Sequence, residues 1–566
     1  MEGCGRIHGY ETRMTAAALR LLGLADRDPL SPTFACFDYP FWRSKTATYV
    51  NARLQEAVYS LALLYREEFP GNDWRGRLEI FELARAGMLF WSDLQHPDGS
   101  FDEWYRGEHG FAATAFSAFA VSRAFGLLEP DLDENSRERL KKTFARAGTW
   151  LSRHDDLDKL NHEAVAAAAL YSLGEALQVP GFAAAASDKA RKVLERQTGE
   201  GWFPELGGLD SGYSFLTLEY LAQCWTFSRA PALAGALEKA LGFLLDLVQP
   251  DLTTGREYNL CGNSYVSLLG AAIMAEFSPA ARELFLQGAS RSNALDQLAQ
   301  DDLSACYHLY NGLLSVLHYR RWCRLYDETA ARLPCQGPPF IRVWPEAGLV
   351  AARTGAYYAL CSARAGGTVK IYPDALPETQ LWKDAGYRLT AGGRTLATGG
   401  WSPAGRLEVL SETAFRVRAG FREVSYFFPG RWLRMMVSLI SAVPGGYLLI
   451  KKGMDLVRKR KSASLQLSRV SGARSRGGLT RKVEFTPQSV RIGDLLERAS
   501  AEPLRAAAAE ISVYSRGVLI ARPAGEPTAS LPGALVRGRQ VRVEKEIAFP
   551  AGAFTVRITG GDVDGE

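Results

Sequence analysis

The stretch Gly201-Trp-Phe-Pro-Glu-Leu-Gly-Gly-Leu-Asp-Ser-Gly-Tyr213 is rich in glycine and polar residues and leads directly into an apolar run, 214–225. The spacing of apolar residues in that run predicts a helix, with Tyr213 in its first turn. Polar or aromatic clusters recur at intervals of 51 residues, at Asn161-His162 before this stretch and Asn263-Ser-Tyr265 after it. Each of them also stands at the start of a predicted helix.

One more interval of 51 residues upstream reaches Gly110, which follows Glu103-Trp-Tyr-Arg-Gly-Glu108 and precedes a predicted helix at 111–127. A repeat of this length with two helical patterns per unit predicts stacked helical hairpins, which are stable only when packed on their neighbours. Equivalent turns then lie on one rim, where helix N-termini favour an anionic ligand. The alternative is that these are ordinary capping turns with aromatic staples.

The 566 residues are too many for one core, so two or more domains are expected. Hydrophobic residues make up 47% and charged residues 23%, as in ordinary soluble proteins. The 67 basic and 62 acidic residues leave a net charge of only +5, which says little about partners.

The first ten residues contain no charged segment followed by an apolar run, so no secretory signal is expected in this sequence. No stretch approaches the ~18 uncharged apolar residues of a membrane span. The eight cysteines form no CxxC pair, which predicts free thiols in a reducing compartment rather than a disulfide framework. We therefore expect a cytoplasmic protein, with a periplasmic or secreted location as the alternative.

Helical periodicity begins near residue 46, after an irregular lead at 1–45, and continues to about residue 330. It ends at Leu333-Pro-Cys-Gln-Gly-Pro-Pro339, beyond which short β-rich runs follow one another, among them Leu433–Ile440. Such runs without intervening helices predict a sandwich. The prediction is an N-terminal (α/α) toroid of helical hairpins over 1–335 and a C-terminal antiparallel β-sandwich over 336–566.

Several motifs together resemble the heparinase II/III-like polysaccharide lyases, over most of residues 40–375. They are Asp98-Gly-Ser-Phe-Asp-Glu-Trp-Tyr105 with Glu108, Asn161-His162, the stretch 201–213 and Trp344-Pro-Glu-Ala-Gly348. The resemblance implies β-elimination of a uronic-acid-containing polysaccharide, in bacterial exopolysaccharide or capsule metabolism. The partner would be an acidic polysaccharide or oligosaccharide, not nucleic acid; oligomeric state stays open.

This chemistry requires that the uronate carboxylate be neutralised before the neighbouring proton is removed. The resemblance assigns that role to Asn161 and His162, and that of the acid, or of both acid and base, to Tyr213. Each has an alternative as a helix cap or a buried polar group. The other candidates, all expected to shape the cleft and bind sugar, are Glu103, Trp104, Tyr105, Arg106, Glu108, Glu205, Asp210, Tyr258, Asn263 and Tyr265.

The sequence departs from this family in two places. Its lyases carry a histidine in the second domain, and no histidine follows His318 here, so the base and any zinc site built on it are missing. Where relatives show an arginine after a Glu-Tyr pair, this chain reads Glu257-Tyr-Asn-Leu-Cys261, and Arg256 or Arg106 would have to substitute. We therefore expect no metal or other cofactor, and a non-catalytic glycan-binding or assembly protein is one alternative.

A toroid glycoside hydrolase is the other alternative, since Glu103, Glu108, Glu205 and Asp210 could supply its two carboxylates. Separately, nine basic residues and no acid lie between Arg458 and Lys482. This segment fits a guarded sheet edge or a polyanion-binding surface.

Overall fold

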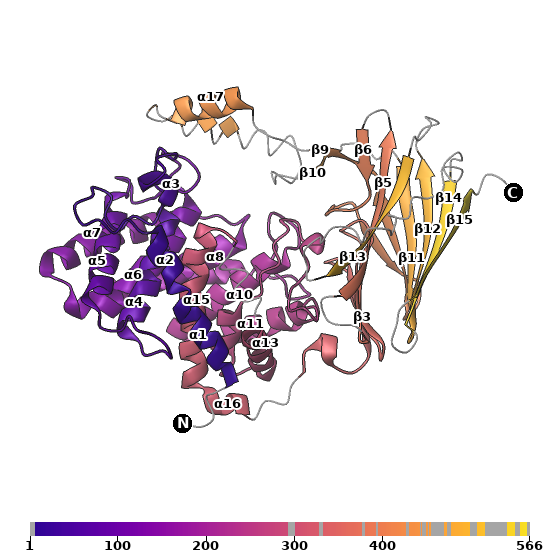
Figure 1. Cartoon of the computed structure of the whole chain (residues 1–566), viewed down its shortest axis with the longest axis horizontal. Coiled ribbons are helices and arrows are strands. Elements are labelled where there is room, and N and C mark those ends of the chain that lie inside the picture. The colour runs from indigo at the N-terminus through magenta and orange to yellow at the C-terminus, as the bar shows by residue number, and fades with distance from the viewer. Residues whose placement is uncertain are drawn as a thin grey trace.

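A computed structural model describes residues 6–291, 300–327, 332–375, 380–391, 394–425, 430–441, 443, 446, 449–450, 452–453, 469–471, 477–498, 506–515, 540–549 and 555–562. The helices of residues 6–327, coloured indigo to rose, lie on one side of the molecule, and two sheets, salmon to yellow, lie on the other (Figure 1). Helices give way to strands between α16 (Cys323–Asp327) and β1 (Phe340–Trp344). The division predicted at 335 falls in this interval, and the independence of the two parts stays a prediction.

Six of the described helices form a closed inner ring. Each of these six packs on the next of the six along the chain, and the sixth packs on the first. In order they are α4 (Ala57–Arg66), α6 (Phe111–Leu128), α8 (Leu160–Leu177), α10 (Ser211–Ser228), α12 (Leu268–Met274) and α15 (Asp302–Arg321).

An outer layer surrounds this ring, and each of its helices packs on an inner one. It consists of α5 (Leu78–Asp93), α7 (Glu134–Arg153), α9 (Pro180–Leu194), α11 (Pro231–Leu245) and α13 (Pro279–Ser290), with α1 (His8–Ala16) against α15. Shorter helices are α2 (Ala18–Leu24), α3 (Tyr39–Trp42), η2 (Ala52–Glu56), η3 (Glu129–Asp131), η4 (Arg256–Tyr258) and η5 (Pro334–Gln336).

The irregular lead predicted for residues 1–45 is wrong for α1, α2 and α3. Tyr10 and Met14 stand one helical turn apart on α1 and are buried. The Tyr10 hydroxyl lies 3.2 Å from Oγ of Ser315, and Arg320 donates a 2.9 Å hydrogen bond to Glu11. Packing against α15 thus stabilises a segment whose own apolar pattern is weak.

The inner helices are rich in small and apolar residues, as their buried position requires. In α8 the alanines between Ala164 and Ala169 are completely buried, and their small side chains let neighbouring inner helices approach on every side. Among the described residues, only Phe111–Asp131 is long and apolar enough to cross a membrane, and 72% of its most apolar window is buried in the protein. Such burial is typical of a core helix.

The first sheet has the strand order β1-β2-β3-β4-β5-β6-β9-β10, with β13 also paired to β5, and the second has the order β15-β14-β12-β11-β8-β7. All the described pairs are antiparallel. The strands not yet bounded are β2 (Leu349–Arg353), β3 (Tyr357–Ser362), β4 (Thr368–Pro373), β5 (Gln380–Ala391), β6 (Arg394–Ala397), β7 (Arg406–Val409), β8 (Ala414–Gly420), β9 (Arg422–Ser425), β10 (Arg469–Ser471), β11 (Gly477–Phe485), β12 (Ser489–Arg498), β13 (Ala506–Ser515), β14 (Gln540–Ala548) and β15 (Thr555–Asp562).

Strand β3 shows how the first sheet is buried on both faces. Tyr358 and Leu360 belong to the core shared with the helices, whereas Tyr357 and Cys361 belong to the core shared with the second sheet. This alternation follows from the two-residue period of a strand. The predicted fold class, an (α/α) toroid followed by an antiparallel β-sandwich, is confirmed.

A fully buried cluster of charged side chains joins the two sheets. Arg481 on β11 donates to both oxygens of Asp494, at 2.7 and 2.8 Å, and to Asp384 at 3.1 Å. Lys545 on β14 donates to Asp384 at 2.7 Å and to Asp494 at 2.8 Å, and the Tyr387 hydroxyl donates to Asp494 at 2.7 Å. The charges of two cations and two carboxylates therefore cancel one another in the interior, out of contact with solvent.

This cluster corrects part of the interpretation of the basic segment, because Arg481 is completely buried and faces neither solvent nor a polyanion. Residues 458–468 and 472–476 of that segment lie outside the described residues.

The strand predicted at 433–440 is also wrong. Those residues belong to a helix, α17 (Arg431–Ser441), which stands apart from both sheets above the toroid (Figure 1). Apolar residues recur there at helical spacing, at positions 432, 435, 436 and 439, and this pattern competes with the local β propensity.

Candidate active site

Hydrogen bonds connect the second, third and fourth of the repeated turns in sequence, and Glu103 of the first turn lies within electrostatic range of His162 in the second. Asn161 Nδ2 donates to Glu205 Oε2 at 2.7 Å, which links the second turn to the third. The backbone amide of Cys261 donates to Asp210 Oδ2 at 2.8 Å, which links the third to the fourth. The repeat in the sequence thus corresponds to a repeat in space.

The first turn is closed by two carboxylates. Asp102 accepts hydrogen bonds from the amides of Gly107 at 2.6 Å and His109 at 3.0 Å. Glu108 accepts from the amides of Glu103 and Trp104, both at 2.8 Å. Burial raises the pKa of Glu108 to about 7.

This turn presents its side chains in two directions. Trp104 is 73% exposed and Arg106 is exposed, so both can reach a ligand on the rim. Tyr105 is half-buried, and Glu103 is buried with its carboxylate 3.4 Å from Arg53.

Arg53, from η2, is a site residue that the sequence analysis missed. Its guanidinium lies over the ring of Phe116, 3.8 Å from the ring centroid, and pairs with Glu56 at 2.8 Å. Although burial opposes the charge, Glu56 and Glu103 raise its pKa. The one usable signal was Asn51, which caps η2 by accepting from the Arg53 amide at 2.9 Å. Because the predicted helical periodicity already begins near residue 46, the start of η2 was not recognised.

His162 lies at the start of α8 and forms a pair with Asp156, with 2.8 Å between Nδ1 and Oδ2. Its ring lies nearly perpendicular to that of Phe116, at a centroid distance of 6.2 Å. Burial lowers the pKa of His162, although Asp156 acts in the opposite direction. The imidazole is therefore neutral at pH 7, with Nδ1 donating to Asp156 and Nε2 left as an acceptor.

Glu205 is a buried carboxyl group at the centre of the third turn. Burial raises the pKa of Glu205 to about 8, so this group carries its proton at pH 7. Its backbone pairs with that of Gly208 at 2.8 and 2.9 Å, which closes the turn.

Asp210 is the N-cap of α10 and accepts a hydrogen bond from the amide of Tyr213 at 3.1 Å. Burial raises the pKa of Asp210 to about 7. Burial also raises the pKa of Tyr213, as do Cys261 and the nearby acids, while Arg53 acts to lower it. The phenol is thus protonated at neutral pH and lies within electrostatic range of Arg53 and Glu205.

The fourth turn connects the rim to the sandwich. Glu257 forms ion pairs with Lys370 at 3.0 Å and Lys383 at 3.7 Å, which come from β4 and β5. Burial opposes the charge on Glu257, but the two lysines lower its pKa. Arg256 is exposed and donates to the Gly262 carbonyl at 3.0 Å.

The other candidates of this turn lie at different depths. Asn263 is half-buried and caps the Tyr265 amide at 3.0 Å. Tyr258 is 1% exposed, and its ring is covered by protein. Tyr265 is buried and its hydroxyl donates at 2.5 Å to Glu219, a fully buried acid on α10.

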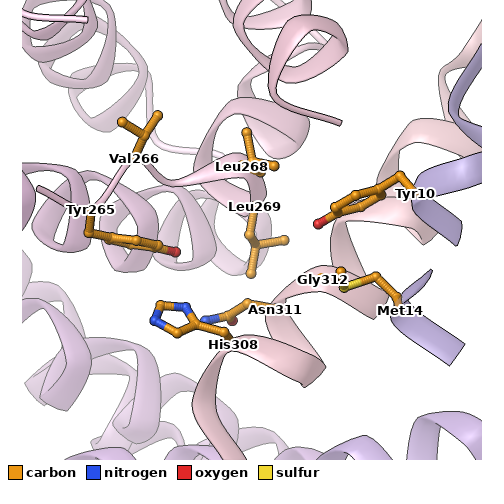
Figure 2. A pocket seen from close by; sticks show the side chains of 9 residues that line it. All are labelled: Tyr10, Met14, Tyr265, Val266, Leu268, Leu269, His308, Asn311 and Gly312. Carbon is orange, nitrogen blue, oxygen red and sulfur yellow. The ribbon is translucent and has the colours of Figure 1, made fainter. Parts of the chain in front are cut away.

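A small cavity lies beneath this turn, and Figure 2 shows Tyr265 and His308 next to each other on one side of it, with Tyr10 on the other side. Their ring centroids are 5.0 Å apart. Burial lowers the pKa of His308 to about 4, so the ring is neutral. The cavity is lined by Tyr10, Met14, Tyr265, Val266, Leu268, Leu269, His308, Asn311 and Gly312.

The sandwich contributes a second residue that the sequence analysis missed. Trp401 packs on Gly208, where an added Cβ atom would stand only 2.4 Å from Cζ2 of the indole. Arg422 holds this loop by donating to the carbonyls of Trp401 at 2.8 Å and Gly400 at 2.6 Å. The feature of the sequence that could have identified it is its place directly after two glycines, in a loop between predicted strands.

Within the described part of the chain, no group of three or more His, Cys, Asp or Glu side chains is arranged to hold a metal ion. The seven described cysteines are free thiols.

Comparisons with known proteins agree with this architecture. Residues 41–205 match the family described as the ulvan lyase N-terminal domain, a range that contains Arg53, Asn161, His162 and Glu205. No curated protein matches the sequence.

Among solved structures, a Paenibacillus xanthan lyase is similar with a TM-score of 0.55 and 8% identity, over 98% of this chain and 55% of that one. A chondroitin AC lyase of Streptomyces coelicolor A3, in complex with chondroitin sulphate, is similar with a TM-score of 0.53 and 11% identity, over 98% of this chain and 76% of that one. The chain shares the fold of these polysaccharide lyases. It spans 55% of the length of the xanthan lyase. The resemblance to the heparinase II/III-like lyases in particular stays a prediction.

Proposed function

We propose that this protein is a polysaccharide lyase that cleaves a uronic-acid-containing polymer by β-elimination at the rim of the toroid. The observation that carries the proposal is the 2.7 Å hydrogen bond from Asn161 to Glu205, which joins the start of α8, with His162, to the turn before α10, with Tyr213. The match of residues 41–205 to the ulvan lyase N-terminal domain supports the same reaction class.

His162 is assigned as the general base, which differs from the carboxylate-binding role suggested by the sequence. Because Nδ1 donates to Asp156 at 2.8 Å, Nε2 carries the lone pair. A neutral imidazole oriented by a carboxylate is suited to removing a proton. This assignment supplies the base that the absence of histidine after His318 left open.

Tyr213 is assigned as the general acid. Its raised pKa keeps the proton on the phenol until the glycosidic oxygen departs. In the reaction, the base takes the proton next to the uronate carboxylate, that electron pair forms the new C=C bond, and the C–O bond to the leaving sugar breaks. The leaving oxygen then takes the proton from Tyr213.

The substrate carboxylate needs donors or positive charge near it. Protonated Glu205 can donate a hydrogen bond, as a carboxyl group with a raised pKa does at an anionic intermediate. Asn161 orients Glu205, and the Arg53 cation lies within electrostatic range of Tyr213. Trp104 and Arg106 on the exposed turn would contact sugars farther along the polymer.

The glycoside hydrolase alternative is less well supported, since its four carboxyl groups already have internal partners. Asp210 and Glu108 each accept two backbone amides. Glu103 faces Arg53, and Glu205 accepts from Asn161. Such groups cap turns rather than activate water.

The experiment is incubation of the protein with a panel of uronic-acid polymers while ultraviolet absorbance and new reducing ends are recorded. A lyase produces both signals in equal amounts, because each elimination creates one unsaturated uronate and one reducing end. Reducing ends without absorbance would support the hydrolase, and binding without either signal would support a glycan-binding protein.

A further inference from the structure

Helix α17 is exposed on nearly all sides. Its apolar side chains include Trp432, Met436 and Leu439, which are 65%, 51% and 59% exposed. Of residues 431–440, whose exposure the structure describes, only Val437 and Ile440 are half-buried. In Figure 1 the helix stands clear of both sheets.

Four of the five large apolar side chains that α17 exposes are arranged in one stripe, and the fifth, Leu433, broadens the apolar face. Trp432, Met435, Met436 and Leu439 follow the spacing i, i+3, i+4 and i+7, which places them on one face of a helix. Val443, four residues on, is also exposed and extends the apolar pattern. The opposite face is narrow and polar, with Arg431, Arg434 and Ser438.

Such a helix needs a surface to pack on. Isolated helices shorter than about 12–15 residues are marginal in water, so most helical stability in proteins comes from packing an apolar face. Scattered apolar side chains on a surface are normal, whereas a contiguous stripe marks an interaction site.

The charge of the region identifies the surface. Between Gly430 and Lys461 the sequence contains eight Lys and Arg residues and a single acid, Asp455. Arg431 and Lys452 are exposed. A short helix with a tryptophan-bearing apolar face and arginines on the polar face is typical of helices that lie in the interface of an anionic bilayer. A protein partner would not require this one-sided charge.

We propose that α17 is an interfacial anchor that docks the protein on an anionic lipid surface, with Trp432, Met436 and Leu439 in the acyl boundary and Arg431 and Lys452 at the headgroups. The proposal is independent of the reaction at the toroid rim, since none of these residues belongs to the candidate site.

The test is sedimentation of the full chain with vesicles of phosphatidylcholine alone or with phosphatidylglycerol added. We expect binding only to the anionic vesicles, weakened by salt. The double variant Trp432→Ser, Leu439→Ser should lower vesicle affinity about tenfold or more through lost apolar burial. The variant Arg431→Glu, Lys452→Glu should lose the preference for anionic lipid.

The matched control is Leu30→Ser, because Leu30 is 92% exposed and lies outside α17. It should bind vesicles like the parent, and all variants should keep the parent melting temperature. Equal binding to both kinds of vesicle, or none, would overturn the proposal. So would a concentration-dependent dimer that Trp432→Ser, Leu439→Ser abolishes, since the stripe would then bind a second copy. Reduced polymer cleavage with unchanged vesicle binding would place α17 over the cleft and contradict it too.

Discussion

Asn161 donates a hydrogen bond of 2.7 Å to Glu205, and both side chains are buried at the rim of the toroid. The bond joins the start of α8 to the turn before α10, so two segments 44 residues apart form one unit. Oδ1 of Asn161 is buried without a partner among the described residues. The protonated Glu205 beside this amide makes the fold less stable as pH rises, since ionising Glu205 would create a buried charge that Lys159 offsets only in part.

The first prediction concerns this acid and pH. The pKa of Glu205 is about 8 in the folded chain and 4.5 when unperturbed. The native state therefore keeps a proton that the unfolded chain has lost, so this contribution to stability is complete below pH 4.5 and is lost as pH rises through about 8. We expect the melting temperature to fall across that range, and to fall less steeply in Glu205→Gln.

The control for this measurement is Glu79→Gln, since Glu79 is exposed in the first turn of α5. It should follow the parent curve at every pH. A Glu205→Gln curve parallel to that of the parent would show that Glu205 is ionised in the native state.

The second prediction concerns Tyr213. Tyr213→Phe removes the phenolic proton and keeps the ring, so we expect normal folding and nearly unchanged polymer binding. Loss of a general acid lowers the rate by about 10² to 10⁴. The measurement is the appearance of unsaturated uronate at saturating polymer. Full activity of the Phe variant on a polymer that the parent cleaves would exclude Tyr213 as the acid.

Asn161→Ala and His162→Ala are compared with Tyr213→Phe, and the two variants should differ in whether KM changes along with the rate. His162→Ala should reduce the rate with little change in KM, as expected for a base. Asn161→Ala should raise KM as well, because Glu205 loses its orientation toward the substrate carboxylate.

The third prediction tests the contact between the sandwich and the third turn. Gly208→Ala places a Cβ atom within 2.4 Å of Trp401, so the indole or the turn has to move. We expect a lower rate of polymer cleavage in Gly208→Ala. Adding Trp401→Ala removes the clash, so the double variant should be more active than Gly208→Ala alone. Contacting residues couple by about 0.5–3 kcal/mol in such cycles, and strictly additive effects would mean that this contact does not position the turn.

The sequence predicted the parts that depend on local pattern. The period of 51 residues located the four turns, and hydrogen bonds join the second to the third and the third to the fourth. Prediction from the sequence failed where contacts between distant parts of the chain determine the structure. Arg53 and Trp401 reach the rim from η2 and from the sandwich, and neither lies in the repeat. The helix α1 depends on burial of Tyr10 against α15, which no local pattern reveals.

The roles of residues were harder to predict than their positions. Asn-His at a helix start suggested two donors for a carboxylate. The partner that changes this interpretation is Asp156, since it holds Nδ1 and leaves Nε2 free to accept a proton. Its effect depends on the geometry of the turn before α8, which the sequence alone did not define.

The last prediction concerns the buried charges of the sandwich. Arg481 bridges Asp384 and Asp494, and all three are completely buried. Arg481→Met leaves two carboxylates with Lys545 as the remaining cation of the cluster. Removing one partner of a buried ion pair costs about 3–5 kcal/mol. We expect a loss of that order in the free energy of unfolding of the protein, measured by chemical denaturation.

Two further variants separate this effect from the loss of a large side chain. Arg491→Met removes an arginine whose ion pair with Glu546 is exposed, so it should cost less than about 1 kcal/mol. In the double variant Arg481→Met, Asp494→Asn the cluster is again neutral, and the loss should be smaller than the sum of the two single losses. If the two losses add, packing of the arginine side chain, and not its charge, holds the two sheets together.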